Sequence, residues 1–186
     1  MKRMHPSRRT RGLTLIELLL FIAVVGIALA AMLRVFVTAT AASADPIIRR
    51  QELAIAESLL REVQLLPFTW CDPDSPNFDD ATSAAACNTV ETIGPEAGET
   101  RYGPTYFDNV NDYHGFSMTG IRDLTNTAVS GLAGYSANVA VTAGTLDSVT
   151  AGSGDALKIT ITVTGPDSST LVLQGWRTRY APQSPY

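Results

Sequence analysis

One acidic residue, Glu17, lies near the start of the most apolar stretch of the chain. This stretch runs from Leu13 to Leu33, which is 21 residues without proline, lysine, arginine or aspartate. A helix of that length crosses the hydrocarbon core of a bilayer. A carboxylate inside such a span costs roughly 2.5–3.5 kcal/mol on insertion scales. Because a cationic partner offsets this cost, Glu17 is a functional candidate whose chemistry is charge pairing.

A local role for Glu17 is also open. Thr14 and Glu17 have the three-residue spacing of a capping box, in which two side chains satisfy backbone N–H groups at the start of a helix. This role places the carboxylate at a helix end, but it does not explain why an acid occurs in an apolar run. The two roles are compatible with each other.

The first twelve residues form a basic leader that ends at Gly12. Positive charge before a first membrane span keeps that end of the chain in the cytoplasm. A secretory signal peptide would have an apolar region of only about 7–15 residues, followed by an A-x-A-like cleavage site. Residues 42–44, Ala-Ser-Ala, offer such a site, so a signal peptide and a plain signal anchor remain alternatives. The five basic residues of the leader are Lys2, Arg3, Arg8, Arg9 and Arg11.

Residues 11–17, Arg-Gly-Leu-Thr-Leu-Ile-Glu, with the apolar stretch after them, resemble the amino-terminal signature of type IV prepilins and type II secretion pseudopilins. The resemblance implies that a prepilin peptidase cuts after Gly12 and that the new amino terminus, Leu13, is N-methylated. It also implies that Glu17 pairs with the amino terminus of a neighbouring subunit. Two positions depart from the usual pattern. Leu13 replaces phenylalanine, and Arg34 stands where many major pilins have a helix-kinking proline.

The same resemblance implies a structural role in a filament. Residues 112–116 and 176–180 further resemble MSHA-type minor pilins, so the expected function is that of a minor type IV pilin in pilus assembly. The closest alternative is a minor pseudopilin of type II secretion, and an alternative of another class is a signal-anchored periplasmic enzyme or binding protein. The implied partners are prepilin peptidase, other pilins, the inner-membrane assembly machinery and membrane lipid. The implied location is the inner membrane, with the body in the periplasm, and then the filament.

The chain beyond the leader is acidic, because it holds nine of the 14 basic residues and all 18 acidic residues. Nucleic-acid binding depends on clustered lysine and arginine, so this class of function is excluded. We interpret the basic groups Arg49-Arg50 and Arg177–Arg179 as solvated or ion-paired. No Walker A, G-x-S-x-G, G-x-G-x-x-G or H-E-x-x-H motif occurs, and His114 is the only histidine beyond the leader. We therefore expect no enzyme and no cofactor.

Two cysteines, Cys71 and Cys87, follow the export signal. An even pair in an exported chain favours a disulfide, and the bridge would close a 17-residue segment. Metal binding is the competing interpretation, but two cysteines and two histidines, with His5 in the leader, cannot supply a four-ligand zinc site. The acidic run 108–112, Asp-Asn-Val-Asn-Asp, leaves calcium binding open as an alternative, but it breaks the EF-hand pattern, so we interpret it as an acidic surface loop. We therefore expect no metal site.

The pattern beyond the apolar stretch predicts one helix and three strands. Apolar residues at helical spacing predict an amphipathic helix over 47–66, and Asp45-Pro46 before it marks either a kink or the start of a second helix. Residues 68–112 are rich in proline, glycine and asparagine and predict loops. Alternating patterns predict strands at 135–142 and 157–164, and the turn at 165–169 predicts that 171–176 returns as an antiparallel partner strand.

Together these elements predict an α+β fold with a long amino-terminal helix, half transmembrane and half amphipathic, packed on a small antiparallel sheet. The expected parts are the leader (1–12), the membrane and filament-core helix (13–44) and an extracytoplasmic globular domain (45–186).

Overall fold

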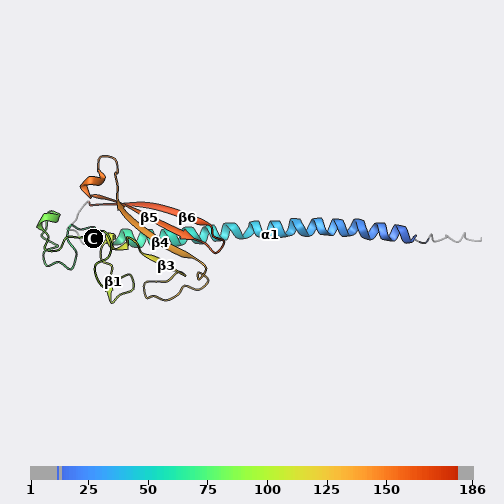
Figure 1. Cartoon of the computed structure of the whole chain (residues 1–186), viewed down its shortest axis with the longest axis horizontal. Coiled ribbons are helices and arrows are strands. Elements are labelled where there is room, and N and C mark those ends of the chain that lie inside the picture. Colours follow the sequence, from blue (N-terminus) through green and yellow to red (C-terminus); the bar gives the residue numbers. More distant parts are fainter. Residues whose placement is uncertain (1–11, 13, 180–186) are drawn as a thin grey trace, which may run out of the picture. The chain divides into compact units, whose positions relative to one another are not determined.

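The computed structural model of the chain describes residue 12 and residues 14–179, without the side chains of residues 39–45. Residues 1–46 and 47–186 form two separate units, which are described in turn. One long helix belongs to both units, and the strands all lie in the second (Figure 1). The elements are α1 (Leu15–Leu65), η1 (Ala84–Ala86), β1 (Glu99–Thr100), β2 (Thr105–Tyr106), η2 (Val110–Tyr113), β3 (Ser117–Thr119), β4 (Ser136–Ala143), η3 (Ala151–Ser153), β5 (Ala156–Thr164) and β6 (Thr170–Thr178).

The first unit contains the apolar part of α1. Its residues Leu15–Thr38 have a mean hydropathy of 2.7 and none of them is buried, so the helix is long and apolar enough to cross a membrane. A single amino-terminal helix of this kind fits a membrane anchor. The helix continues through Pro46 and ends at Leu65, immediately before Leu66 and Pro67. Its end agrees with the expected end of the amphipathic helix.

The second unit contains a four-stranded antiparallel sheet in the order β3-β4-β5-β6. The three strands expected from the sequence are confirmed as β4, β5 and β6. The fourth strand, β3, has only three residues, which is too short for a period-2 pattern to be recognised. The parallel pair of β1 and β2 was also not expected, because each strand contributes only two residues.

The hydrophobic core lies between the last part of α1 and one face of this sheet. The helix contributes the expected stripe, of which Ile55, Leu59 and Val63 are buried. The sheet contributes the inward side chains of β4 and β5, where buried residues alternate with more exposed ones. The expected α+β fold is confirmed. The buried sheet residues are Ala137, Val139, Val141, Leu157, Ile159, Ile161 and Val163.

The edge strand β6 lies against α1, and two glycines permit the close approach. A Cβ at Gly175 would lie 2.7 Å from Leu60 Cδ1, and one at Gly165, before β6, would lie 2.8 Å from Glu52 Oε1. Side chains of the helix also pair with backbone groups of the strand, since Gln64 Nε2 donates to Trp176 O at 3.3 Å. The hydrogen bond from Gln64 thus satisfies one backbone carbonyl of this edge strand.

The region between α1 and β3 is loop-rich, as expected, but the interpretation of 108–112 as a surface loop is wrong. The last three residues of this run begin η2, and Val110, Asn111 and Asp112 are all buried. Val110 N–H donates to Pro67 O at 3.1 Å, which ties the turn to the end of α1. The acidic composition predicted an exposed segment, but this backbone hydrogen bond holds residues 110–112 against the end of α1, where they are buried.

Candidate functional site

The start of α1 brings Thr14 and Glu17 together as the spacing predicts. Thr14 Oγ1 accepts a hydrogen bond from Glu17 N–H at 3.4 Å, and Thr14 O accepts from Leu18 N–H at 3.2 Å. These contacts form one half of a capping box, the half that satisfies free N–H groups at a helix start. Among the described residues, no group donates to the Glu17 carboxylate, so the reciprocal half is absent. Leu13 lies outside the described residues.

The surroundings of Glu17 are apolar and exposed. Leu15, Ile16 and Leu18 are on the surface of the helix, and so are the larger apolar side chains that follow up to Val37. Exposed apolar surface of this extent marks a face that contacts lipid or another protein. Glu17 therefore lies in an exposed apolar surface of the kind that contacts lipid or another protein.

Gly12 shows no structural reason to be a glycine. It is exposed, its φ is not in the left-handed region, and a Cβ added there would meet no atom within 4 Å. A larger residue would therefore fit the local structure.

Several charged side chains in the second unit differ from Glu17, because they form ion pairs within the chain. Arg101, which is 5% exposed, forms a bidentate pair with Glu62 of α1, with Nε to Oε1 at 2.6 Å and Nη2 to Oε2 at 2.8 Å. Tyr113 also donates to Glu62. Burial lowers the pKa of Arg101, but its hydrogen bonds and charge interaction with Glu62 outweigh this effect, so the pKa is raised overall.

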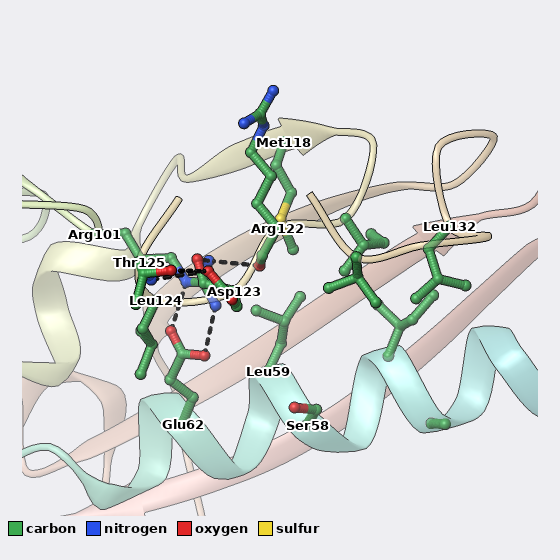
Figure 2. Close-up of a pocket in the computed structure, with 14 residues that line it drawn as sticks. Ser58, Leu59, Glu62, Arg101, Met118, Arg122, Asp123, Leu124, Thr125 and Leu132 are labelled. Atoms are coloured by element: carbon green, nitrogen blue, oxygen red, sulfur yellow. Dashed lines mark hydrogen bonds and ion pairs between the residues drawn. The ribbon is translucent and has the colours of Figure 1, made fainter. Parts of the chain in front are cut away.

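This pair lies at one end of the pocket shown in Figure 2. The pocket has a volume of about 540 Å³ and lies between α1 and the segment from Met118 to Leu132. In the picture Glu62 projects from α1 toward Arg101, with dashed lines between them. Arg101 Nη1 also donates to Arg122 O at 3.0 Å. Since these charges are already paired, the pocket offers apolar surface and no nucleophile–base pair.

Two further buried charges were not expected from the sequence. Glu52 on α1 is fully buried, accepts a hydrogen bond from Ser169 Oγ at 2.6 Å and pairs with Arg49 at 3.3 Å. Arg179 pairs with Asp155 at 3.4 Å. One arginine of each basic group, Arg49 of Arg49-Arg50 and Arg179 of Arg177–Arg179, is thus confirmed to form an ion pair. No sequence signal distinguishes these buried acids and bases from exposed ones, because their partners are distant in the chain.

Arg179 is also held by aromatic rings. Its guanidinium carbon lies 3.8 Å from the ring centroid of Phe68 and 3.9 Å from that of Trp70, and it donates to Thr69 O. Cation–π contacts of this kind are stronger when the cation is desolvated. They fix the end of β6 to the chain just after α1.

The cysteines are joined as the sequence predicts. Cys71 and Cys87 form a disulfide with a Cα–Cα distance of 5.3 Å. Cys71 is buried and its backbone pairs with Val90 across an isolated bridge. His114, the histidine beyond the leader, is exposed, and its Nδ1 accepts a hydrogen bond from Val141 N–H at 3.2 Å.

Comparison with known proteins adds one finding. The sequence model of a family described as the prokaryotic N-terminal methylation motif matches residues 7–33. This match supports a type IV prepilin-like protein and suggests a structural subunit. No curated protein matches the chain significantly, and no solved structure does so.

Proposed function

We propose that the chain is a minor type IV pilin of the MSHA type, similar to MshD, and acts as a structural subunit in pilus assembly. One observation carries this proposal. The methylation motif over residues 7–33 includes a carboxylate, that of Glu17, which has no partner in the described part of the chain and lies on an exposed apolar helix. An unpaired charge in such a surface is stabilised when another subunit supplies the opposite charge.

Processing would supply that charge. A prepilin peptidase cuts after Gly12, removes the leader (1–12) and leaves Leu13 as an N-methylated, positively charged amino terminus. The exposed Gly12, which local packing does not require to be glycine, supports recognition by such an enzyme. Residues 13–44 then form the membrane and filament-core helix, and residues 45–186 form the exported domain.

Glu17 would set the register between subunits. The new amino terminus of Leu13 lies four residues before Glu17, and both charges are in or near hydrocarbon, where each is costly when unpaired. Pairing between two subunits satisfies both charges and fixes the axial offset of neighbouring helices. Glu17 would therefore pair only with a subunit that has already been cleaved, because an uncleaved subunit has no amino terminus at Leu13.

The proposed location follows from charge and cysteine chemistry. The basic leader holds the amino terminus in the cytoplasm by the positive-inside rule, and the single span Leu15–Thr38 passes the chain through the inner membrane. The body then lies in the periplasm, where an oxidising environment permits the disulfide between Cys71 and Cys87. After assembly the subunit is part of the filament.

Mass spectrometry of the mature amino terminus tests this function. We expect a chain that begins at Leu13 and carries one methyl group on its α-amine. A matched control is Gly12→Ala, which the structure accommodates and which should retain the leader. An intact amino terminus in a strain with an active prepilin peptidase would contradict the proposal, and so would cleavage near Ala44.

The second candidate is a minor pseudopilin of type II secretion, because the methylation motif is common to both systems. Deletion of the gene distinguishes them. Loss of surface pili with normal protein secretion favours the pilin, and the reverse result favours the pseudopilin. The resemblance of residues 112–116 and 176–180 to MSHA-type minor pilins is the reason for placing the pilin first.

A further inference from the structure

Three acidic side chains, Glu91, Glu96 and Asp112, converge inside the second unit. One carboxylate oxygen from each lies within 4.8 Å of those of the other two. Glu91 and Glu96 belong to the segment after the disulfide loop, and Asp112 belongs to η2. The two segments are joined by a backbone hydrogen bond from Gly94 N–H to Asn111 O at 3.1 Å. Their meeting point is therefore part of the folded structure.

Several oxygens at this point are buried without a hydrogen-bond partner. Asp112 is fully buried, and its Oδ2 accepts from Asp108 N–H at 2.9 Å and from Asn109 N–H at 2.7 Å. Its other oxygen, Oδ1, has no partner, and neither oxygen of Glu91 has one. Buried polar groups in folded proteins are almost always paired, so unpaired carboxylate oxygens indicate a missing ligand.

In the described residues no ion pair or hydrogen bond joins a protein cation to these three acids. Arg179 attracts Glu91 electrostatically, but its guanidinium forms its ion pair with Asp155. The described ion pairs are Arg49–Glu52, Arg101–Glu62 and Arg179–Asp155, and none includes the three acids. A second acidic group adjoins them, formed by Asp72, Asp74 and Asp108, and it increases the negative potential. Mutual repulsion in a buried place makes the fully charged cluster unstable unless a cation neutralises it.

The pKa values agree with this geometry. Burial, with the charges of Asp112 and Glu96, raises the pKa of Glu91 to about 9. Burial also raises the pKa of Asp112 to about 7. Glu99, whose pKa rises to about 8 because of burial and a hydrogen bond with Glu96, extends the cluster. These raised pKa values have the same cause as the geometry, carboxylates buried among like charges, and this is an environment that a divalent cation stabilises.

We propose that Glu91, Glu96 and Asp112 form a structural binding site for one calcium ion. The donor set contains only oxygen, which selects a hard cation over zinc or copper. Both free oxygens of Glu91 suit bidentate coordination, which calcium accepts readily, whereas magnesium requires a regular octahedron and retains its water. Asn111, next to Asp112, has a buried amide oxygen without a partner and is available as a further ligand. Water would complete the shell.

The ion would stabilise a region that has little regular structure. Glu91 follows the disulfide loop and its N–H donates to Trp70 O at 3.1 Å, near the end of α1. Asp112 precedes Gly115, whose N–H donates to Val139 O in the sheet at 3.0 Å. A calcium ion between Glu91 and Asp112 thus connects the segment that follows α1 to the segment that enters the sheet.

Calcium titration of the full chain, purified in detergent and stripped with EDTA, tests the site. We expect calorimetric binding with a dissociation constant of about 10⁻⁴–10⁻³ M, the range of extracellular calcium modules. We also expect the unfolding temperature to rise with calcium and to rise less with magnesium at the same concentration. The absence of both binding and a thermal shift would overturn the proposal.

Two variants locate the ion. Glu91→Gln keeps the shape of a protonated glutamate, so the metal-free protein should fold and retain its disulfide, but calcium affinity should fall at least about tenfold, the lower limit seen even when only an outer-shell partner is lost. Asp80→Asn is the matched control, because Asp80 is exposed in the same loop region and is not one of the clustered acids. Equal calcium affinity of these two variants would overturn the assignment to Glu91.

Discussion

Glu17 in the first unit and the ion-paired residues of the second unit differ in where their partners lie. In the second unit the buried Glu52 and Arg101 and the partly buried Glu62 and Arg179 each have a partner within the same chain. In the first unit Glu17 lies on an apolar helix and no described group contacts its carboxylate. The second unit therefore supplies partners for these charges itself, whereas the proposed partner of Glu17 belongs to another subunit. Substitutions in the two units should accordingly have different effects: on assembly in the first and on folding in the second.

The largest expected effect is that of Glu17→Gln, which keeps the shape of the side chain and removes its charge. We expect normal membrane insertion and normal cleavage after Gly12, but near-complete loss from sheared filament fractions when the wild-type copy is deleted. The measurement is the ratio of mutant protein in filaments to that in the inner membrane. The matched control is Glu57→Gln, at an exposed position of α1, which should assemble normally. Incorporation of Glu17→Gln equal to wild type would favour the capping role instead.

A large effect on stability is expected from Arg101→Met. Removing one partner of a buried pair leaves Glu62 with an uncompensated charge, which destabilises a protein by about 3–5 kcal/mol. Thermal unfolding of the full chain in detergent measures this loss. The control is Arg61→Met, at an exposed position of α1 next to Glu62, which should change stability by less than about 0.5 kcal/mol. Similar stability of the two variants would show that the Glu62–Arg101 pair does not hold the segment between β1 and β2 to α1.

Removing the disulfide should have a more local effect. Replacing Cys71 and Cys87 together with alanine should cost about 3 kcal/mol in the chain-entropy model. Hydrogen exchange should increase between residues 68 and 112 more than in β4–β6, because that region has little regular structure of its own. A uniform increase across the sheet would contradict this account. Wild-type protein treated with a reductant provides the comparison.

The smallest expected effect is that of Gly175→Ala. The new Cβ would lie 2.7 Å from Leu60 Cδ1 and 2.8 Å from Gln64 Nε2, so α1 and β6 must separate slightly or these side chains must move. Overpacking of this kind costs about 1–3 kcal/mol, and flexible side chains place the value at the lower end. Gly152→Ala is the control, since its Cβ meets no atom within 4 Å. Equal unfolding temperatures for Gly175→Ala and Gly152→Ala would indicate that α1 and β6 are not in close contact at Gly175.

The sequence predicted the parts of the fold that depend on periodicity. The stripe of Ile55, Leu59 and Val63 and strands β4 and β5 repeat a pattern, the apolar helix is one unbroken apolar run, and β6 was predicted from the turn before it; all are found in the structure. The pairing of Cys71 with Cys87 was also predicted, because only two cysteines are present. Elements of two or three residues, such as β1, β2 and β3, are held by neighbours in space and leave no periodic signal.

The charged network was not predicted, and the reason is sequence distance. Arg101 lies 39 residues from Glu62, so no local pattern connects them. The acidic cluster is a similar case. Residues 108–112 do not match the EF-hand pattern and were predicted to be a surface loop. In the folded chain, Glu91 and Glu96 lie close to the buried Asp112. Glu17, by contrast, was identified at once, since an acid in an apolar run is a local anomaly.

The central claim is that the carboxylate of Glu17 is paired by a neighbouring subunit. Zero-length carbodiimide cross-linking of intact filaments, followed by mass spectrometry, tests it most directly. We expect peptides in which the Glu17 carboxyl is joined to the amino-terminal nitrogen of another subunit, and we expect this product to be missing in Glu17→Gln. A product that joins Glu17 only to the Leu13 nitrogen of its own chain would contradict the claim.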